Sequence, residues 1–175
     1  LKKNQSIEEI HEACSSLADM IIHLLNQHSE LSFLFIPHDN RGKLSDTIVL
    51  PIIANKIREK GYAQRIKEIK EVYHADEIKA IASLCDIMIC SRMHLAIGSL
   101  SSGVPVMAAT YQGKFHGLFK HYGLPEDLLL SPATFITKEF ISTFERLLKE
   151  KKSLAKILQE KQPEINILSA KNIEE

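Results

Sequence analysis

Apolar and polar positions recur along the chain with two periods, and together they predict helices and strands in turn. Residues 7–27 carry apolar side chains at helical spacing behind a capping box that starts at Ser6, which predicts an amphipathic helix. Residues 31–37 form a continuous apolar run, typical of a strand buried on both faces. Residues 48–61 return to helical spacing, and Pro51 should delay the start of this second helix or bend it.

The same alternation continues through the middle of the chain. Residues 69–73 predict a weak strand, whose lysines and glutamates suit the edge of a sheet. Residues 75–84 predict a helix and residues 86–90 a short buried strand. Residues 93–100 are spaced as a helix, and residues 104–109 are apolar again. The central stretch is therefore predicted to be strand, helix, strand.

The last third adds helices and one short strand. Residues 115–122 predict an amphipathic helix, and residues 128–130 a short strand. Residues 137–150 and 153–160 predict two further helices. Strands that alternate with helices indicate an α/β fold, which we expect to be a doubly wound, Rossmann-like and mostly parallel sheet of about five strands with helices on both faces.

Length and composition suit one well-buried domain over residues 1–175, since 45% of the residues are hydrophobic. Lys plus Arg and Asp plus Glu both number 22, so the net charge gives no reason to expect nucleic acid or a membrane surface as a partner. An anion site would have to be local.

The cysteines and the hydropathy bear on the compartment. Cys14, Cys85 and Cys90 lack metal-ligand spacing, and two of them lie in apolar stretches typical of buried free thiols. No apolar run approaches the roughly 18 residues of a spanning helix, and the N-terminus lacks a signal-peptide core. We therefore expect a cytoplasmic protein that does not span a membrane. The first residue is Leu1 rather than Met, which suggests a piece of a longer protein.

Three basic side chains follow the two strands of the central stretch. Arg92 and His94 come directly after the first strand, and Lys114 follows the second. A parallel pair with a right-handed crossover brings these positions to the carboxyl edge of the sheet, where open α/β sheets bind ligands. Cationic groups beside a helix N-terminus are suited to a compact anion. His38, which follows the strand at residues 31–37, is a further candidate.

Each candidate also has an ordinary explanation. Arg92 has as its partner either an anionic ligand or a structural carboxylate such as Asp86. His94 can share a ligand with Arg92 only if Arg92 lies in the extended turn before the helix. Lys114 alone is an ordinary loop lysine, and His38 is equally a turn residue or a site residue.

Two other groups of residues suit structural roles better. Asp76 and Glu77 suit the capping of the helix at residues 75–84. The remaining histidines show no ligand spacing, so we expect no metal site.

Four motifs resemble the polysaccharide pyruvyl transferase family. They are YHADEIKAIASLCD at residues 73–86, SRMH at 91–94, LSSGVP at 100–105 and YQGKFHG at 111–117. The loop at residues 36–38 and the downstream Ser45 and Asp46 are similar to the family as well, and the resemblance covers roughly residues 31–130.

The resemblance implies a fold and an activity. Members resemble two-domain GT-B glycosyltransferases and transfer pyruvate from phosphoenolpyruvate to a sugar of a cell-envelope polysaccharide, as a ketal with release of phosphate. This chain would be the C-terminal, donor-side half, and it lacks the N-terminal domain that would hold a glycan or lipid-linked acceptor. We therefore expect the isolated chain to be folded but inactive, with phosphoenolpyruvate as its donor substrate and no cofactor.

The resemblance also implies roles for the candidates. Arg92, Lys114 and His38 would bind the phosphate and carboxylate of the donor, and His94 would be the catalytic acid or base. Ser91, Tyr111 and Glu77 are possible further site residues.

Two rival functions stay open. A GT-B glycosyltransferase or a sugar-nucleotide epimerase would bind a nucleotide diphosphate at the same edge, with a carboxylate such as Glu77 on a ribose. A non-catalytic domain would keep the fold with an empty site. The absence of a Gly-rich phosphate loop argues mildly against the first, and the set of Arg92, His94 and Lys114 argues against the second.

Overall fold

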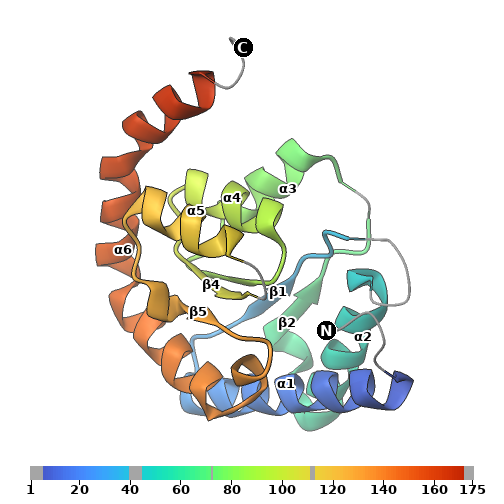
Figure 1. Cartoon of the computed structure of the whole chain (residues 1–175). Helices are drawn as coiled ribbons and strands as arrows, with labels where there is room; N and C mark the ends of the chain where they lie inside the picture. Colours follow the sequence, from blue (N-terminus) through green and yellow to red (C-terminus); the bar gives the residue numbers. More distant parts are fainter. Residues whose placement is uncertain (1–5, 40–44, 72, 111–112, 172–175) are drawn as a thin grey trace. The chain divides into compact units, whose positions relative to one another are not determined.

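Helices alternate with short strands along the chain (Figure 1). The computed structural model describes residues 6–39, 45–71, 73–110 and 113–171. In chain order the elements are α1 (Ile7–Gln27), β1 (Phe33–Phe35), α2 (Asp46–Ile57), η1 (Arg58–Tyr62), η2 (Ala63–Arg65), β2 (Ile66–Glu68), α3 (Ala75–Ala82), β3 (Met88–Cys90), α4 (Met93–Ser101), β4 (Val106–Ala109), α5 (Lys114–Tyr122), η3 (Glu126–Leu128), β5 (Leu129–Leu130), η4 (Thr134–Ile136) and α6 (Lys138–Lys171). This order confirms the predicted α/β class.

The described strands are all paired in parallel, but they form two sheets. β1 pairs with β2 in a two-stranded sheet, and β3, β4 and β5 form a three-stranded sheet in that order. The predicted single sheet of about five strands is therefore not seen. Hydrophobic periodicity identifies a strand and its buried faces, whereas the choice of neighbours depends on contacts distant in sequence.

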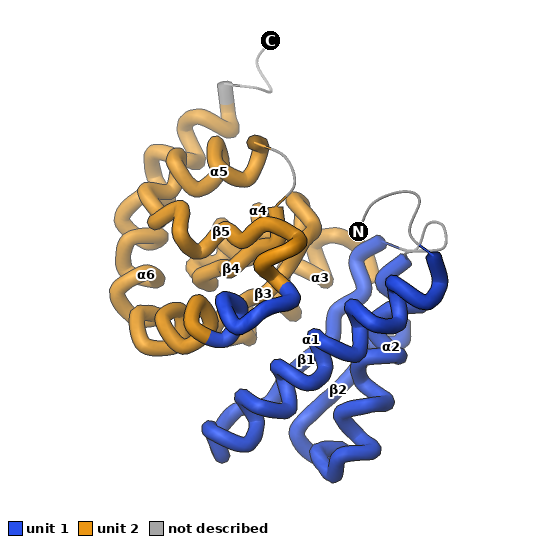
Figure 2. The backbone as a smooth tube through the Cα atoms, turned by 60° about the horizontal axis from the view of Figure 1, so that its bottom comes forward, with its two compact units in different colours: residues 1–72, 136–141 blue, residues 73–135, 142–175 orange. Residues whose placement is uncertain are grey.

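The chain divides into two compact units (Figure 2). Unit 1 comprises residues 1–72 and 136–141, and unit 2 comprises residues 73–135 and 142–175. Unit 1 contains the β1–β2 sheet, and unit 2 contains the β3–β4–β5 sheet. The single domain predicted for residues 1–175 stays a prediction.

The first helix of unit 1 has the predicted start and end. Ser6 Oγ accepts the Glu9 N–H at 3.1 Å, and Glu9 Oε2 accepts the Ser6 N–H at 2.8 Å, so the capping box is confirmed. The apolar face of α1 is buried in a core shared with α2 and both strands. That core consists of Ile10, Cys14, Ala18, Ile21, Leu25, Phe35, Ile53, Ala54, Ile57 and Ile66.

The second helix runs through a proline. α2 starts at Asp46, two residues before the predicted start, and Pro51 lies inside it. A proline in a helix removes one N–H donor, and the remaining hydrogen bonds and the buried side chains of Ile53 and Ile57 keep this helix continuous. Gly61 then adopts φ 92°, a left-handed conformation that ends the helical segment where the sequence predicted.

The second strand of unit 1 lies earlier than predicted. β2 is Ile66–Glu68, whereas the sequence favoured residues 69–73. The pairing aligns Phe33 with Ile66 and Phe35 with Glu68, and Ile66 is buried in the unit 1 core. A single buried isoleucine beside Lys67 and Glu68 gives too short a pattern for periodicity to detect.

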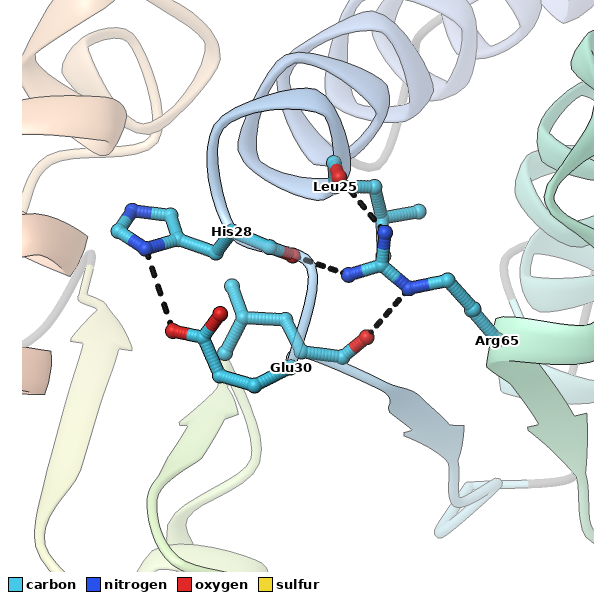
Figure 3. Close-up of polar contacts among 5 residues, drawn as sticks. Leu25, His28, Glu30 and Arg65 are labelled. Carbon is cyan, nitrogen blue, oxygen red and sulfur yellow. Dashed lines mark hydrogen bonds and ion pairs between the residues drawn. The ribbon is translucent and has the colours of Figure 1, made fainter.

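Arg65 fastens the start of β2 to the end of α1 (Figure 3). Its Nε donates to the Leu31 carbonyl at 2.7 Å and its Nη1 to the Leu25 carbonyl at 2.7 Å, while its Nη2 donates to the His28 carbonyl. The planar guanidinium presents five N–H donors in a fixed fork, so it can satisfy several carbonyl groups in a defined geometry. Arg65 therefore orders the turn that leads from α1 into β1.

In unit 2, β4 is the central strand and all four of its residues are buried. Its neighbours align Met88 with Val106 and Ala109 with Leu130. A strand that is apolar throughout fits the middle of a parallel sheet, because both of its faces are covered. α4 and α5 lie side by side in this unit (Figure 1).

The last helix is one element where the sequence predicted two. α6 runs from Lys138 to Lys171, through the stretch at residues 151–152 and through Pro163. In unit 2 it buries Phe144, Leu147, Leu154 and Leu158 at helical spacing. Two lysines do not break a helix, so the gap predicted between residues 150 and 153 was wrong.

We predict that Arg65→Met lowers the free energy of unfolding by about 2 kcal/mol, because it removes hydrogen bonds from a charged donor to three carbonyl groups. Arg65→Lys should give a smaller loss. Lys67→Met, on the exposed side of the same segment, is the matched control and should change stability by less than about 0.5 kcal/mol. Urea unfolding followed by circular dichroism measures all three, and equal effects of Arg65→Met and Lys67→Met would show that the three bonds contribute little.

Candidate functional site

Ser91 and Arg92 form the turn between β3 and α4. Arg92 is the N-cap residue of α4, with φ −103° and ψ 119°, and its carbonyl accepts the first helical bond from Ala96 at 3.0 Å. Arg92 thus lies in the extended turn before the helix, and His94 is the second helical residue and exposed. This arrangement meets the condition under which Arg92 and His94 can contact the same ligand.

The turn after β4 ends at the same edge of the sheet. Thr110 follows β4, and its N–H donates a hydrogen bond to the Leu130 carbonyl at 2.8 Å. Lys114 is the first residue of α5. Because β3 and β4 are parallel neighbours, their carboxyl ends lie at one edge. The structure therefore places Ser91, Arg92, His94 and Lys114 at the carboxyl edge of the unit 2 sheet.

The N-termini of α4 and α5 differ from those of the other described α-helices. Neither has an acidic residue in its first turn. The first turns of α1, α2, α3 and α6 all contain Asp or Glu. Acidic side chains normally balance the positive end of a helix dipole. At the carboxyl edge of unit 2, basic residues stand there instead, which favours an anionic ligand.

Acidic residues at the opposite edge of this sheet are paired with α6. Asp86, which precedes β3, forms an ion pair with Lys151, and its Oδ1 accepts a hydrogen bond from Lys151 Nζ at 2.8 Å. Asp127, which precedes β5, pairs with Arg146, and the same arginine binds Glu150 at 3.1 Å. These pairs raise the pKa of Arg146, and the hydrogen bond that Arg146 donates to Glu150 contributes most. Asp86, considered above as a structural partner of Arg92, thus pairs with a lysine at the amino edge.

Cys90 lies at the end of β3, directly before the Ser91–Arg92 turn. It is buried, and desolvation raises the pKa of its thiol to about 12, while a hydrogen bond from the Arg92 backbone lowers it slightly. Burial also raises the pKa of Cys85, with a smaller contribution from the charge of Asp86. A thiol with so high a pKa stays protonated near neutral pH, so Cys90 packs as an apolar residue beneath the turn.

The other predicted residues lie elsewhere or outside the described part. Glu77 Oε2 accepts the His74 N–H at 2.8 Å, so Glu77 caps α3 as the ordinary explanation predicted. His38 follows β1 in unit 1, and its N–H donates to Asp46 Oδ2 at 3.0 Å. Tyr111 lies outside the described residues. The binding and catalytic roles assigned to these residues stay predictions.

Two polar contacts were not predicted from the sequence. Asp46 accepts hydrogen bonds from two residues of the loop after β1, and His116 Nδ1 lies 2.9 Å from Glu126 Oε2. In the sequence, Asp46 is an acidic residue near the start of a predicted helix. That position predicts a favourable interaction with the helix dipole, but it does not predict hydrogen bonds to the loop after β1. His116 and Glu126 are both exposed, and nothing in the spacing of the sequence indicated that they would meet.

Unit 2 is thus an α/β unit in which basic side chains stand at the carboxyl edge of a parallel sheet, beside two helix N-termini whose first turns contain no acidic residue. The chain belongs to the polysaccharide pyruvyl transferase family, whose model matches residues 4–113. The match starts earlier and ends earlier than the resemblance at residues 31–130, and it stops one residue before Lys114. The comparisons with curated proteins and with solved structures found no match.

Two further searches of the described residues gave negative results. None of the helices in that part of the chain is both long enough and apolar enough to cross a bilayer. No three His, Cys, Asp or Glu side chains among the same residues are grouped so as to hold a metal ion.

We predict that Cys90 reacts with iodoacetamide at pH 8 more slowly than Cys85 does, because alkylation requires an exposed thiolate. Burial raises the pKa of the Cys90 thiol from its ordinary value of 9.0 to about 12, so its contribution to stability is fully present below about pH 9 and is lost as the pH rises toward 12. Mass spectrometry of timed aliquots gives the two rates, with protein in urea as the control. Equal rates in the folded protein would contradict the burial of Cys90.

Proposed function

We propose that this chain is the donor-binding part of a polysaccharide pyruvyl transferase, which uses phosphoenolpyruvate to place a pyruvyl ketal on a sugar hydroxyl pair and releases phosphate. Family membership supports the general activity. The choice of phosphoenolpyruvate as the donor substrate is supported by the residues at the starts of α4 and α5. Two neighbouring helices, α4 and α5, start at one edge of the sheet without an acidic residue, and Arg92, His94 and Lys114 occupy their starts.

Phosphoenolpyruvate is a small molecule with two anionic groups, and the proposed roles follow from that. Arg92 is suited to a bidentate hydrogen bond with the carboxylate or phosphate, since its guanidinium presents parallel donors. Lys114 supplies a point charge, and the first N–H groups of α4 are further donors. We propose Ser91 and Tyr111 as additional hydrogen-bond donors to this substrate.

Ketal formation requires two proton transfers that balance. The methylene carbon of phosphoenolpyruvate gains a proton and becomes a methyl group, which leaves its C2 carbon electrophilic. One sugar hydroxyl and then a second add to C2 with loss of their protons, and the bond from C2 to the phosphate oxygen breaks. One of the two hydroxyl protons replaces the one given to the methylene carbon, and the other leaves with the phosphate.

His94 is the residue that we propose for proton transfer. It is exposed in the first turn of α4, next to the turn that holds Arg92. Histidine is the residue that most often serves as a general acid or base in proteins. The reaction uses no cofactor in this proposal. Whether His94 acts as acid or base depends on which face of the donor it meets.

The acceptor side of the proposal lies outside these residues. A sugar with two hydroxyl groups aimed at C2 must be held in place, and such positioning can contribute roughly 7–11 kcal/mol to lowering a barrier. We propose that a facing domain, as in GT-B-like enzymes, binds the glycan or lipid-linked acceptor in the cytoplasm, so that the present residues alone bind donor without turnover. The rival in which Glu77 binds a ribose is less favoured, because its carboxylate already caps α3.

We predict that Arg92→Ala weakens phosphoenolpyruvate binding by about 10–100-fold, as expected for the loss of a charge-assisted hydrogen bond. Arg92→Lys should weaken it less, because the charge remains while the fork is lost. Lys120→Ala is the matched control, since Lys120 is exposed in the last turn of α5 and should leave binding unchanged. Isothermal titration calorimetry measures the affinities. Equal affinities of wild type and Arg92→Ala would mean that Arg92 is structural.

We predict that His94→Asn in an enzyme that includes the acceptor domain lowers the rate of phosphate release from phosphoenolpyruvate by about 10²–10⁴-fold and keeps most of the donor affinity. The matched control is His121→Asn, a histidine in the last turn of α5, for which the rate should not change. A phosphate-release assay gives the rate and a separate titration gives the affinity. Loss of donor binding with normal turnover at saturating donor would reassign His94 to recognition.

A further inference from the structure

The three strands of unit 2 lead into one row of residues at the carboxyl edge of their sheet. β3, β4 and β5 are neighbours in that order (Figure 2), and their register aligns Cys90 with Ala108 and Ala108 with Leu129. Two positions further along the three segments are Arg92, Thr110 and Ser131. Because neighbouring strands lie about 4.8 Å apart, the backbone of Ser131 is about 10 Å from that of Arg92, with Thr110 between them.

The backbone at each end of this row supports the alignment. Arg92 has φ −103° and ψ 119°, so the chain after β3 is still extended at this residue. The N–H of Thr110 donates to the Leu130 carbonyl at 2.8 Å, so the pairing of β4 with β5 continues to the residue before Ser131. All three residues of the row belong to unit 2. Ser131 therefore lies at the same edge as Arg92, on the far side of β4.

The hydroxyl group of Ser131 is exposed and fixed by the turn that follows β5. Ser131 Oγ accepts the N–H of Thr134 at 3.1 Å and lies 3.0 Å from Thr134 Oγ1. The Thr134 hydroxyl also lies 3.1 Å from the Ser131 carbonyl, which it can reach as a donor. The local explanation of Ser131 is thus that it caps the short helix η4.

The same turn allows Ser131 to donate its hydrogen elsewhere. A serine hydroxyl has one hydrogen and two acceptor lone pairs. When Thr134 donates both its N–H and its O–H to Ser131 Oγ, both lone pairs are used and the hydrogen of Ser131 is available to a group outside the turn. An anion is a better acceptor than the neutral Thr134 oxygen, because hydrogen bonds to charged groups are stronger. Binding of an anion beside Ser131 is therefore compatible with an intact turn.

We propose that Ser131 donates a hydrogen bond to the anionic group of phosphoenolpyruvate that Arg92 does not hold, an inference that rests on the proposed function. The donor carries a carboxylate and a phosphate, and a row that spans three strands has hydrogen-bond donors on both sides of β4. A hydroxyl contributes direction rather than charge. Ser131 thus favours an anion whose second group lies at the right separation from the first, and acts as a specificity-determining residue.

Two substitutions of the same shape test the hydroxyl group. Ser131→Thr keeps the hydroxyl, whereas Ser131→Val replaces it by a methyl group. Calorimetry with phosphoenolpyruvate should give nearly the wild-type affinity for Ser131→Thr and an affinity about tenfold lower for Ser131→Val, as expected for a lost hydrogen bond to a charged group. The matched control is Ser83→Ala, since Ser83 is an exposed serine of unit 2 whose hydroxyl donates to the Ala80 carbonyl at 2.7 Å. It should bind as wild type does.

A second measurement separates contact with the ligand from a general effect on the turn. Inorganic phosphate and pyruvate each carry one of the two anionic groups, and their affinities are measured by chemical-shift titration. We expect Ser131→Val to weaken the binding of only one of them, and Arg92→Ala to weaken the binding of the other more strongly. A distorted turn would instead weaken both to the same extent, and that result would overturn the inference.

The outcomes distinguish this inference from the proposed function. If neither wild type nor Ser131→Thr binds phosphoenolpyruvate, the proposed function is wrong and this inference falls with it. If wild type binds and Ser131→Thr and Ser131→Val bind equally well, only this inference is overturned. Unchanged donor affinity together with a raised KM for the sugar acceptor, measured for Ser131→Val in an enzyme that includes the acceptor domain, would assign Ser131 to the acceptor and overturn it as well.

Discussion

The parallel pairing of β3 with β4 is the constraint on which the candidate site depends. Two parallel neighbours end at the same edge of their sheet, so Ser91 after β3 and Thr110 after β4 are brought together although they are distant in sequence. Each turn leads into a helix whose N-terminus starts at that edge. The pairing therefore places Arg92, His94 and Lys114 with two helix N-termini, and no direct contact between these side chains is needed to explain it.

The charges of unit 2 are divided between the two edges of its sheet. At the amino edge, Asp86 and Asp127 are neutralised by Lys151 and Arg146 of α6. At the carboxyl edge, basic side chains stand at helix ends that already carry partial positive charge. Because the acids are paired where α6 passes, they do not compete for the basic groups across the sheet. A buried apolar strand, β4, lies between the two edges.

The sequence predicted local features well and long-range ones poorly. The helix at residues 7–27 was predicted correctly because its capping box and its apolar spacing are set by neighbouring residues. The position of β2 and the continuity of α6 were missed, since Ile66 gives a very short pattern and the stretch at residues 151–152 has no breaker. The pairing of strands into two sheets depends on contacts between distant residues, which periodicity does not report.

The helices that follow β1 and β3 begin beside charged residues of opposite sign. After β1, the chain supplies its own anion: Asp46 stands at the start of α2 and binds the N–H groups of His38 and Asp39. After β3, the first turn of α4 contains no acidic residue, and Arg92 occupies the corresponding place before this helix. An external anion stabilises a helix N-terminus little when a carboxylate is already there. At a helix N-terminus that follows an arginine, an anion can pair with the guanidinium and can also accept hydrogen bonds from the first N–H groups. The start of α2 is thus balanced by its own carboxylate, whereas the start of α4 is suited to an external anion.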